Sequence, residues 1–112
     1  MSPIKNIEKV AAQSVNIRNL IGKQILQTPC LATRESFPNE TRVYFKTENF
    51  QHTGSFKIRG AISKLKHISK ESALITASSG NHGIACSHAA MVTGHNLTVV
   101  LPENVAKSKL AK

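Results

Sequence analysis

The sequence predicts an α/β fold that contains a parallel βαβ unit, and three observations support this prediction. A short apolar run, ALITA at 73–77, is followed at once by SSGNHG, a polar turn with two glycines. A largely apolar helix is expected from about Asn81 to Val92, and a second apolar run lies at 97–101. Strand, helix and strand with short links form a βαβ unit, whose strands are parallel and whose crossover is right-handed. Ligands of such sheets bind beyond the carboxyl ends of the strands, which is where SSGNHG lies.

The first part of the chain is expected to hold one long helix and two strands. Ser2-Pro3 offers a cap followed by proline at the first helical position, and Gly22 is a plausible stop for this helix. A short strand is expected at 30–33. A second strand, rich in β-branched and aromatic residues, is expected at about 41–48.

A second helix is expected from Ser55 to about Ile68. Ser55 suits the N-cap position, where its hydroxyl accepts a hydrogen bond from a backbone N–H of the first turn. Apolar residues then recur at helical spacing and predict one buried stripe, formed by Ile58, Ala61, Ile62 and Leu65.

The helix predicted at 81–92 carries apolar residues around most of its circumference, so we expect it to be buried. Gly94 is expected to end this helix in the left-handed conformation. A last helix is expected from Val105 to Lys112, where the sequence stops.

Lys57 is the anomaly of the helix predicted at 55–68. A lysine in the first turn faces the positive end of the helix dipole, which disfavours a cation. Arg59 adds positive charge two residues later. Both effects favour a lowered pKa of Lys57 and more of the free amine, the form that attacks carbonyl carbons. Taken alone, this window favours an ordinary solvated lysine over an activated one, and both interpretations stay open at this point.

The segment SSGNHG, at 78–83, suits an anion-binding site. Gly80 and Gly83 allow close backbone approach, and the helix N-terminus that follows offers free N–H groups and a positive dipole end. Further donors are the side chains of Ser78, Ser79, Asn81 and His82. A capped turn without a ligand is the alternative, but these glycines and polar side chains exceed what capping requires.

The formal net charge of +9 comes from 15 lysines and arginines against six acidic residues. Such a balance raises the question of a nucleic-acid partner. The basic residues are spread along the chain, however, and its few aromatic residues do not interleave with a basic run. We therefore predict no nucleic-acid partner, and a preference for anionic small molecules such as phosphates and carboxylates.

Other classes of protein are also disfavoured. The chain has no apolar run of about 18 residues, the length that spans a membrane, and its N-terminus lacks the apolar core of a signal peptide. We expect a cytoplasmic protein without a disulfide between Cys30 and Cys86. His82, Cys86 and His88 share part of a helix face, but without a fourth ligand they predict no metal site.

Two windows together resemble the fold-type II pyridoxal-phosphate enzymes, and most closely the threonine/serine dehydratase and serine racemase group. ENFQHTGSFKIRGA, at 48–61, is similar to the lysine motif of that group, and TASSGNHGIA, at 76–85, is similar to its asparagine loop. The resemblance covers nearly the whole chain. It implies a partial three-layer open sheet of the tryptophan synthase β-like type. Residues 1–48 would then belong to the large domain and residues 49–112 to the first, incomplete part of the small cofactor domain.

The resemblance also implies a cofactor, pyridoxal 5′-phosphate, and the residues that would hold it. Lys57 would bind it covalently as a Schiff base. Phe56 would lie against its pyridine ring, and Asn81 would donate a hydrogen bond to its ring hydroxyl oxygen.

The same resemblance implies how a small amino acid would bind. Ser78, Asn81 and His82 would hold its carboxylate together with backbone N–H groups of the loop. Ser79 matches the residue that acts as acid and base in serine racemases, on the face of the substrate opposite the lysine.

The implied activity is a dehydratase that removes water and ammonia from serine or threonine and leaves a 2-oxo acid. A serine racemase is the alternative within the group, and a non-catalytic anion-binding module or truncated remnant is the alternative outside it. Members of the group are longer, and the glycine-rich loop that binds the cofactor phosphate is missing from this sequence. We therefore expect a fragment that is inactive by itself and depends on a missing C-terminal part or on a homo-oligomer.

Overall fold

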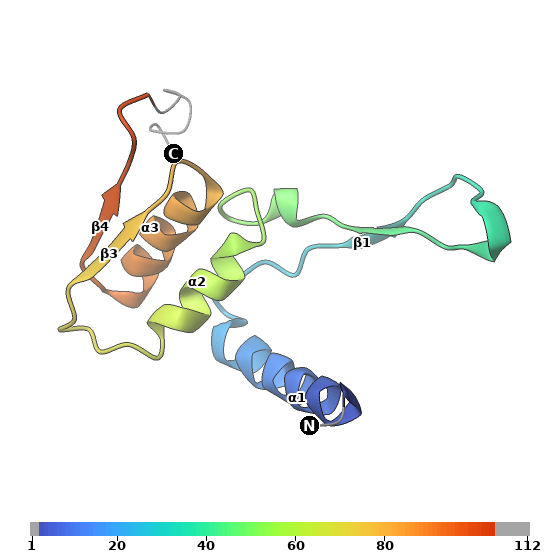
Figure 1. The fold of residues 1–112 in the computed structure, drawn as a ribbon, viewed down its shortest axis with the longest axis horizontal. Coiled ribbons are helices and arrows are strands. Elements are labelled where there is room, and N and C mark those ends of the chain that lie inside the picture. Colours follow the sequence, from blue (N-terminus) through green and yellow to red (C-terminus); the bar gives the residue numbers. More distant parts are fainter. Residues whose placement is uncertain (1–2, 105–112) are drawn as a thin grey trace.

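The computed structural model of the protein describes residues 3–104 (Figure 1). The helix expected at 105–112 lies outside these residues. In chain order the elements are α1 (Pro3–Ile21), β1 (Cys30–Ala32), the 3-10 helix η1 (Pro38–Glu40), β2 (Tyr44–Lys46), the 3-10 helix η2 (Glu48–Phe50), α2 (Lys57–Leu65), β3 (Leu74–Ala77), α3 (Asn81–Thr93) and β4 (Leu97–Val100).

The predicted βαβ unit is confirmed. β3 and β4 pair in parallel, with α3 between them in the chain, and the register runs from Leu74 opposite Leu97 to Ala77 opposite Val100. Gly94 follows α3 with φ of 75°, the left-handed conformation that glycine adopts without steric strain. The predicted end of this helix is therefore also confirmed.

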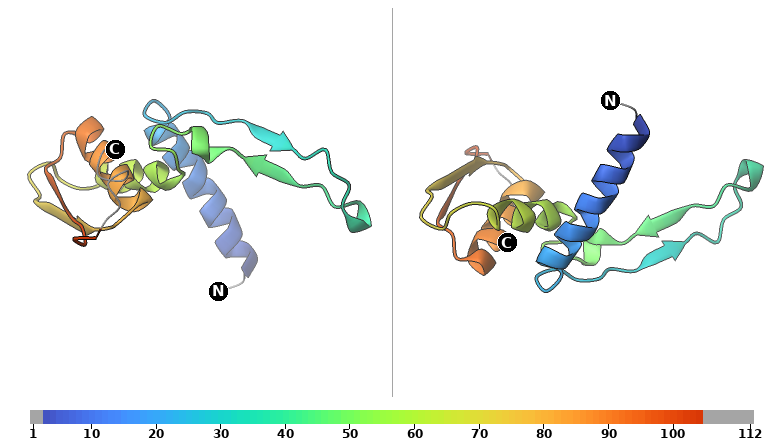
Figure 2. Two further views of the ribbon diagram at one scale, coloured as in Figure 1. Left: turned by 90° about the horizontal axis from the view of Figure 1, so that it is seen from above. Right: turned by 90° about the horizontal axis from the view of Figure 1, so that it is seen from below.

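The strands β1 and β2 form an antiparallel pair in a separate sheet. Leu31 lies opposite Phe45, and both side chains are more than half exposed. Both strands are shorter than the sequence predicted, because each has a single partner and neither face of the pair is covered. The hairpin projects as an arm from the rest of the molecule (Figures 1 and 2).

The core lies between α2 and α3, which pack against each other more extensively than any other pair of elements. The stripe predicted for α2 is confirmed, since all four of its apolar residues are buried. Alanines on α3 allow the two helices to approach closely. The buried cluster consists of Ile21, Ile58, Ala61, Ile62, Leu65, Ala85, Ala89 and Ala90.

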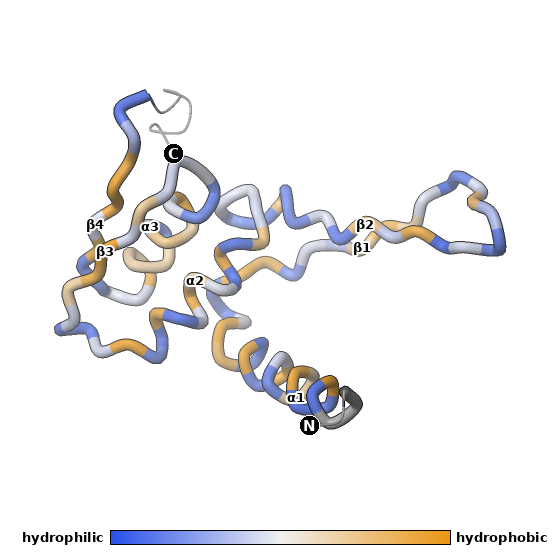
Figure 3. Tube along the Cα trace, viewed as in Figure 1, coloured by the Kyte–Doolittle hydropathy of each residue, from blue (hydrophilic) through white to orange (hydrophobic). Residues whose placement is uncertain are grey.

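The molecule is extended. Its radius of gyration is 17.3 Å, whereas a compact chain of this length has a value of about 13 Å. Figure 2 shows from two sides that α1 and the hairpin project away from the unit formed by α2, α3, β3 and β4. Hydrophobic residues occur along the projecting hairpin and along β4 (Figure 3). None of the described helices is both long and apolar enough to cross a membrane.

Two expectations about the helices are wrong. Ser55 is not the N-cap of α2, which begins at Lys57 after Phe56; the Ser55 hydroxyl is buried and has no hydrogen-bond partner among the described residues. α3 is not buried all round, because Met91 is 71% exposed and Val92 is 40% exposed. Only the face of α3 that packs on α2 and the strands is covered.

Candidate active site around Lys57

Lys57 is the first residue of α2, as the sequence predicted for a lysine in the first turn. Its side chain is exposed, and its Nζ lies 5.4 Å from the centroid of the Phe56 ring. Such an arrangement is a cation–π contact when the amine is charged. Phe56 is itself 60% exposed, so its ring is open to a ligand.

A cavity of about 460 Å³, the Lys57 cavity, lies between α2, β3 and α3. It is lined by Phe56, Lys57 and His82 of the predicted site residues, and also by Lys64 and Cys86. The remaining lining is largely apolar. This size and composition are typical of small-molecule and cofactor sites.

The residues Ser78, Ser79 and Asn81 do not line the Lys57 cavity. Ser78 and Ser79 lie in the loop between β3 and α3, whereas Asn81 is the first residue of α3 and precedes His82; Ser79 and Asn81 are exposed. A larger cavity of about 610 Å³ lies at the C-terminal end of α1, and none of the predicted site residues lines it.

Ser78 shapes the loop. Its Oγ accepts hydrogen bonds from the N–H groups of Gly80, at 3.2 Å, and Gly83, at 2.9 Å. The N–H groups of Asn81 and His82 have no acceptor among the described residues, so they remain available to an anion at the helix N-terminus. The hydroxyl of Ser78 also donates to the carbonyl oxygen of Gly80 at 3.5 Å, so it is engaged with the backbone both as acceptor and as donor.

Gly83 is required by close packing rather than by an unusual dihedral. A Cβ atom at this position would lie 3.2 Å from the carbonyl oxygen of Ser78 and 3.3 Å from Cγ1 of Val99. The loop therefore wraps directly against β4, and this close approach fixes where α3 begins.

Replacing Gly83 by alanine is expected to destabilise the fold by about 1–3 kcal/mol, because the backbone of Ser78 must move to admit the methyl group. Gly60 offers the matched control: it lies inside α2, and an added Cβ meets nothing within 4 Å. Gly60→Ala is expected to stabilise by about 0.5–1 kcal/mol. Urea titration followed by circular dichroism measures both changes, and a destabilisation shared equally by the two variants would contradict the packing argument.

His82, Cys86 and His88 do not come together as a group. The Sγ of Cys86 lies 3.6 Å from Nε2 of His82, whereas the ring of His88 stacks on His52 with centroids 5.7 Å apart. Burial raises the pKa of the Cys86 thiol. Among the described residues, no group of three or more histidine, cysteine or acidic side chains is arranged to hold a metal ion.

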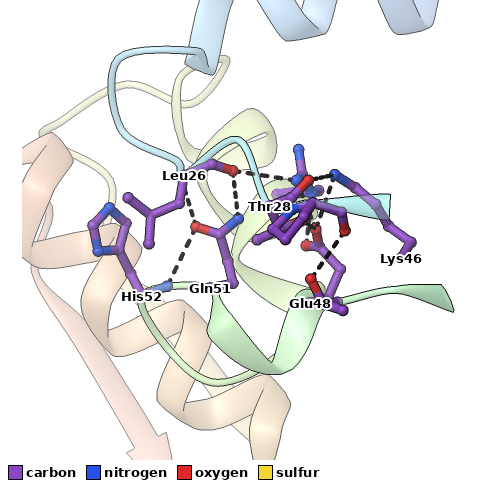
Figure 4. A network of polar contacts seen from close by, with 9 residues as sticks. Leu26, Thr28, Lys46, Glu48, Gln51 and His52 are labelled. Carbon is purple, nitrogen blue, oxygen red and sulfur yellow. Dashed lines mark hydrogen bonds and ion pairs between the residues drawn. The ribbon is translucent and has the colours of Figure 1, made fainter. Parts of the chain in front are cut away.

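Sequence reasoning missed a polar network centred on Glu48, which reaches the first turn of α2 through Arg59 (Figure 4). The Nε and Nη2 atoms of Arg59 donate to the two carboxylate oxygens of Glu48 at 2.8 Å and 2.7 Å. The hydroxyl of Thr28 donates to the same carboxylate at 2.5 Å. Lys46 donates to the carbonyl of Thr28. The charge of Arg59 is thus compensated by the carboxylate of Glu48.

The hydrogen bonds from Arg59 hold the pKa of Glu48 at about 2, against 4.5 for an ordinary glutamate. Thr28 and Lys46 act in the same direction, and burial opposes them. Because the folded state lowers this pKa, the stabilisation is complete above about pH 4.5 and is lost as the pH falls towards 2.

We therefore expect Glu48 to contribute up to about 3 kcal/mol of stability near neutral pH, a contribution that acid removes. Unfolding free energies measured at a series of pH values should fall more steeply in the wild type than in Glu48→Gln below about pH 4.5. Equal pH dependence in the two proteins would show that Glu48 is not held as an ion pair.

Comparison with known proteins identifies the family. Residues 21–112 match the model of the pyridoxal-phosphate dependent enzymes. The chain belongs to this family. Both motifs singled out in the sequence lie within the match, and pyridoxal phosphate is the cofactor of the family, as the sequence predicted.

Two curated relatives of the chain are named as enzymes that act on L-threonine. The chain is 44% identical over 73 residues to L-threonine ammonia-lyase of Thermotoga maritima, covering 62% of this chain and 18% of that protein. It is 40% identical over 95 residues to L-threonine dehydratase TdcB of Staphylococcus aureus, covering 79% of this chain and 28% of that protein. The chain therefore spans less than a third of the length of either relative.

Solved structures in this family share the fold. A pyridoxal 5′-phosphate-dependent aspartate racemase superposes with a TM-score of 0.75 at 34% identity, covering 86% of this chain and 32% of that one. Serine racemase from Dictyostelium discoideum superposes with a TM-score of 0.71 at 39% identity, covering 86% and 33%. The predicted fold class, a partial fold-type II sheet that contains a parallel βαβ unit, is confirmed.

Proposed function

We propose that the chain forms the lysine-bearing part of a pyridoxal-phosphate-dependent serine/threonine dehydratase. The observation that carries this proposal is the meeting of Lys57, Phe56 and His82 at one cavity beside the loop at 78–83. The chain's family and its threonine dehydratase relatives support the same reaction class.

The described residues fit pyridoxal phosphate in part. The Lys57 cavity has a suitable volume. Lys57 would hold the group covalently through Nζ, the exposed Phe56 ring offers a flat apolar surface, and Asn81 offers an amide donor. The buried hydroxyls of Thr53 and Ser55, which have no hydrogen-bond partner within residues 3–104, lie in the segment that leads to Lys57. When bound, the cofactor acts as an electron sink for the carbanion formed at Cα of an amino acid.

The chain's own residues would bind the substrate and move a proton. The substrate carboxylate is proposed to accept from the free N–H groups of Asn81 and His82, at the positive end of α3. The Asn81 and His82 side chains add donors, and the Ser78 hydroxyl becomes one when it exchanges its 3.5 Å hydrogen bond to the carbonyl oxygen of Gly80 for the carboxylate. The free amine of Lys57 is proposed to take the proton from Cα as general base. The Cβ–O bond then breaks, and the β-hydroxyl leaves as water after taking up a proton that balances the one removed from Cα. Hydrolysis of the resulting unsaturated amine, through its imine, consumes one water and releases the 2-oxo acid and ammonia.

Serine racemisation is the second candidate function. Three of the similar solved structures are racemases, and Ser79 is the exposed hydroxyl of the loop, placed beside the proposed carboxylate site. In this alternative Ser79 exchanges the Cα proton from the face opposite Lys57.

We further propose that catalysis needs the rest of a fold-type II subunit or a second copy of the chain. Large apolar side chains are exposed on both projecting elements, with Ile7 and Val10 on α1 and Phe45 on β2, and also on β3, at Ile75. Exposed apolar surface of this extent marks an association surface. Residues 1–48 would supply the large domain and residues 49–112 the small one.

A chimera tests the proposal. The segment of Staphylococcus aureus L-threonine dehydratase that matches this chain is replaced by the chain, and formation of a 2-oxo acid from L-threonine and L-serine is measured. Turnover by the chimera, and none by the isolated 112-residue chain, is the expected result. A soluble, correctly assembled chimera that binds the cofactor without turning over either amino acid would overturn the proposal.

A further inference from the structure

Lys57 has no hydrogen-bond or ion-pair partner of its own among the described residues, and its contact there is the Phe56 ring. Its position in the cavity therefore depends on how firmly the first turn of α2 is held. Arg59 belongs to that turn, and its guanidinium contacts Glu48 with two parallel hydrogen bonds. A bidentate pair of this kind fixes direction as well as distance.

Glu48 is in turn fixed from the other side. Its side chain is 14% exposed, and the hydroxyl of Thr28, itself buried, donates to it at 2.5 Å. The carboxylate thus joins the segment before β1, the segment after β2 and the first turn of α2. These segments are distant in the sequence, so no local propensity holds them together.

Gln51 adds a second attachment three residues after Glu48. Its buried side-chain amide accepts from the N–H of Leu26 at 2.7 Å and donates to the carbonyl of Leu26 at 2.9 Å (Figure 4). The 3-10 helix that carries Glu48 is therefore anchored to residues 26–28 at both ends. Glu48 presents a rigid carboxylate to Arg59 rather than one on a free loop.

We propose that Glu48 is a positioning residue for Lys57, acting through Arg59. This inference rests on the proposed function only in giving Lys57 a chemical role. Loss of the Glu48 carboxylate leaves Arg59 without its partner and releases the turn that begins α2. The Lys57 side chain then samples more orientations, and pyridoxal phosphate attaches to Lys57 less selectively relative to the other lysines.

The experiment uses the full 112-residue chain in three forms: wild type, Glu48→Gln, and the matched control Glu35→Gln. Glu35 is an exposed acid with no ion-pair partner among the described residues. Each form is treated with pyridoxal 5′-phosphate and borohydride, and the ratio of label on Lys57 to label on Lys64 is read from peptide maps. Amide hydrogen exchange of the peptide that begins at Phe56 is measured without cofactor.

Glu48→Gln is expected to raise the rate of amide hydrogen exchange in the peptide that begins at Phe56 roughly tenfold. It is also expected to lower the ratio of label on Lys57 to label on Lys64, whereas Glu35→Gln changes neither quantity. The double variant Glu48→Arg, Arg59→Glu is expected to restore much of both signals, which guards against general unfolding by a single substitution. Unchanged exchange in Glu48→Gln would overturn the positioning role. Equal labelling of Lys57 and Lys64 in the wild type would instead count against the proposed role of Lys57, while the exchange measurement still decides the role of Glu48.

Discussion

Replacing Lys57 by alanine in the chimera is expected to abolish covalent retention of pyridoxal phosphate and to lower turnover about a thousandfold or more. The reason is that the amine serves both as the point of attachment and as the proposed base, so no single other group replaces it. The absorbance of the bound cofactor and the rate of 2-oxo acid formation measure the two effects separately.

Lys64 provides the most demanding control for this prediction. It lies two turns further along α2 and lines the same cavity as Lys57. Lys64→Ala should therefore leave attachment and most turnover intact. After borohydride reduction, the cofactor should be found on the peptide that contains Lys57; label on Lys64 or Lys66 would contradict the assignment.

Replacing Ser79 by alanine is expected to separate racemisation from elimination. Racemisation and elimination from D-serine should fall by about a hundredfold or more, while much of the activity on L-serine and L-threonine remains. Ser79 is proposed to face the substrate from the side away from Lys57, so only reactions that move a proton on that side need it.

The comparison requires both activities to be measured on the same preparation, by chiral analysis of serine and by 2-oxo acid formation. Ser87→Ala is a suitable control, because Ser87 is exposed on α3 and does not belong to the loop. If Ser79→Ala reduces both activities equally, Ser79 only shapes the loop or binds the carboxylate. A chimera with no racemisation at all would leave the dehydratase as the better function.

Local patterns predicted the βαβ unit well. The stripe of α2, the stop at Gly94 and the parallel pairing of β3 with β4 each depend on residues close in the sequence, and each is confirmed. The family and its cofactor were predicted from two motifs, at 48–61 and 76–85, that are close together in the sequence. The roles given to single residues of those motifs stay predictions.

Other features depend on distant parts of the chain, and the predictions about them were wrong or were not made. Ser55 has the chemistry of a cap, but tertiary packing buries its hydroxyl away from the helix end. The outer face of α3 is apolar in sequence, yet no described element covers it. The role of Glu48 could not be predicted from its local pattern, because its hydrogen-bond partners Thr28 and Arg59 lie 20 and 11 residues away.

The tight unit of α2, β3, α3 and β4 occupies one uninterrupted stretch of chain, and this has a consequence for how the protein acquires its structure. Contacts between neighbouring segments have low contact order and need little loop-closure entropy, so such a unit forms quickly. The link from Thr28 through Glu48 to Arg59 spans 20 and 11 residues and is as local as the contacts inside that unit. Lys57 thus stands where the unit meets the N-terminal segments, and its final placement requires both to form.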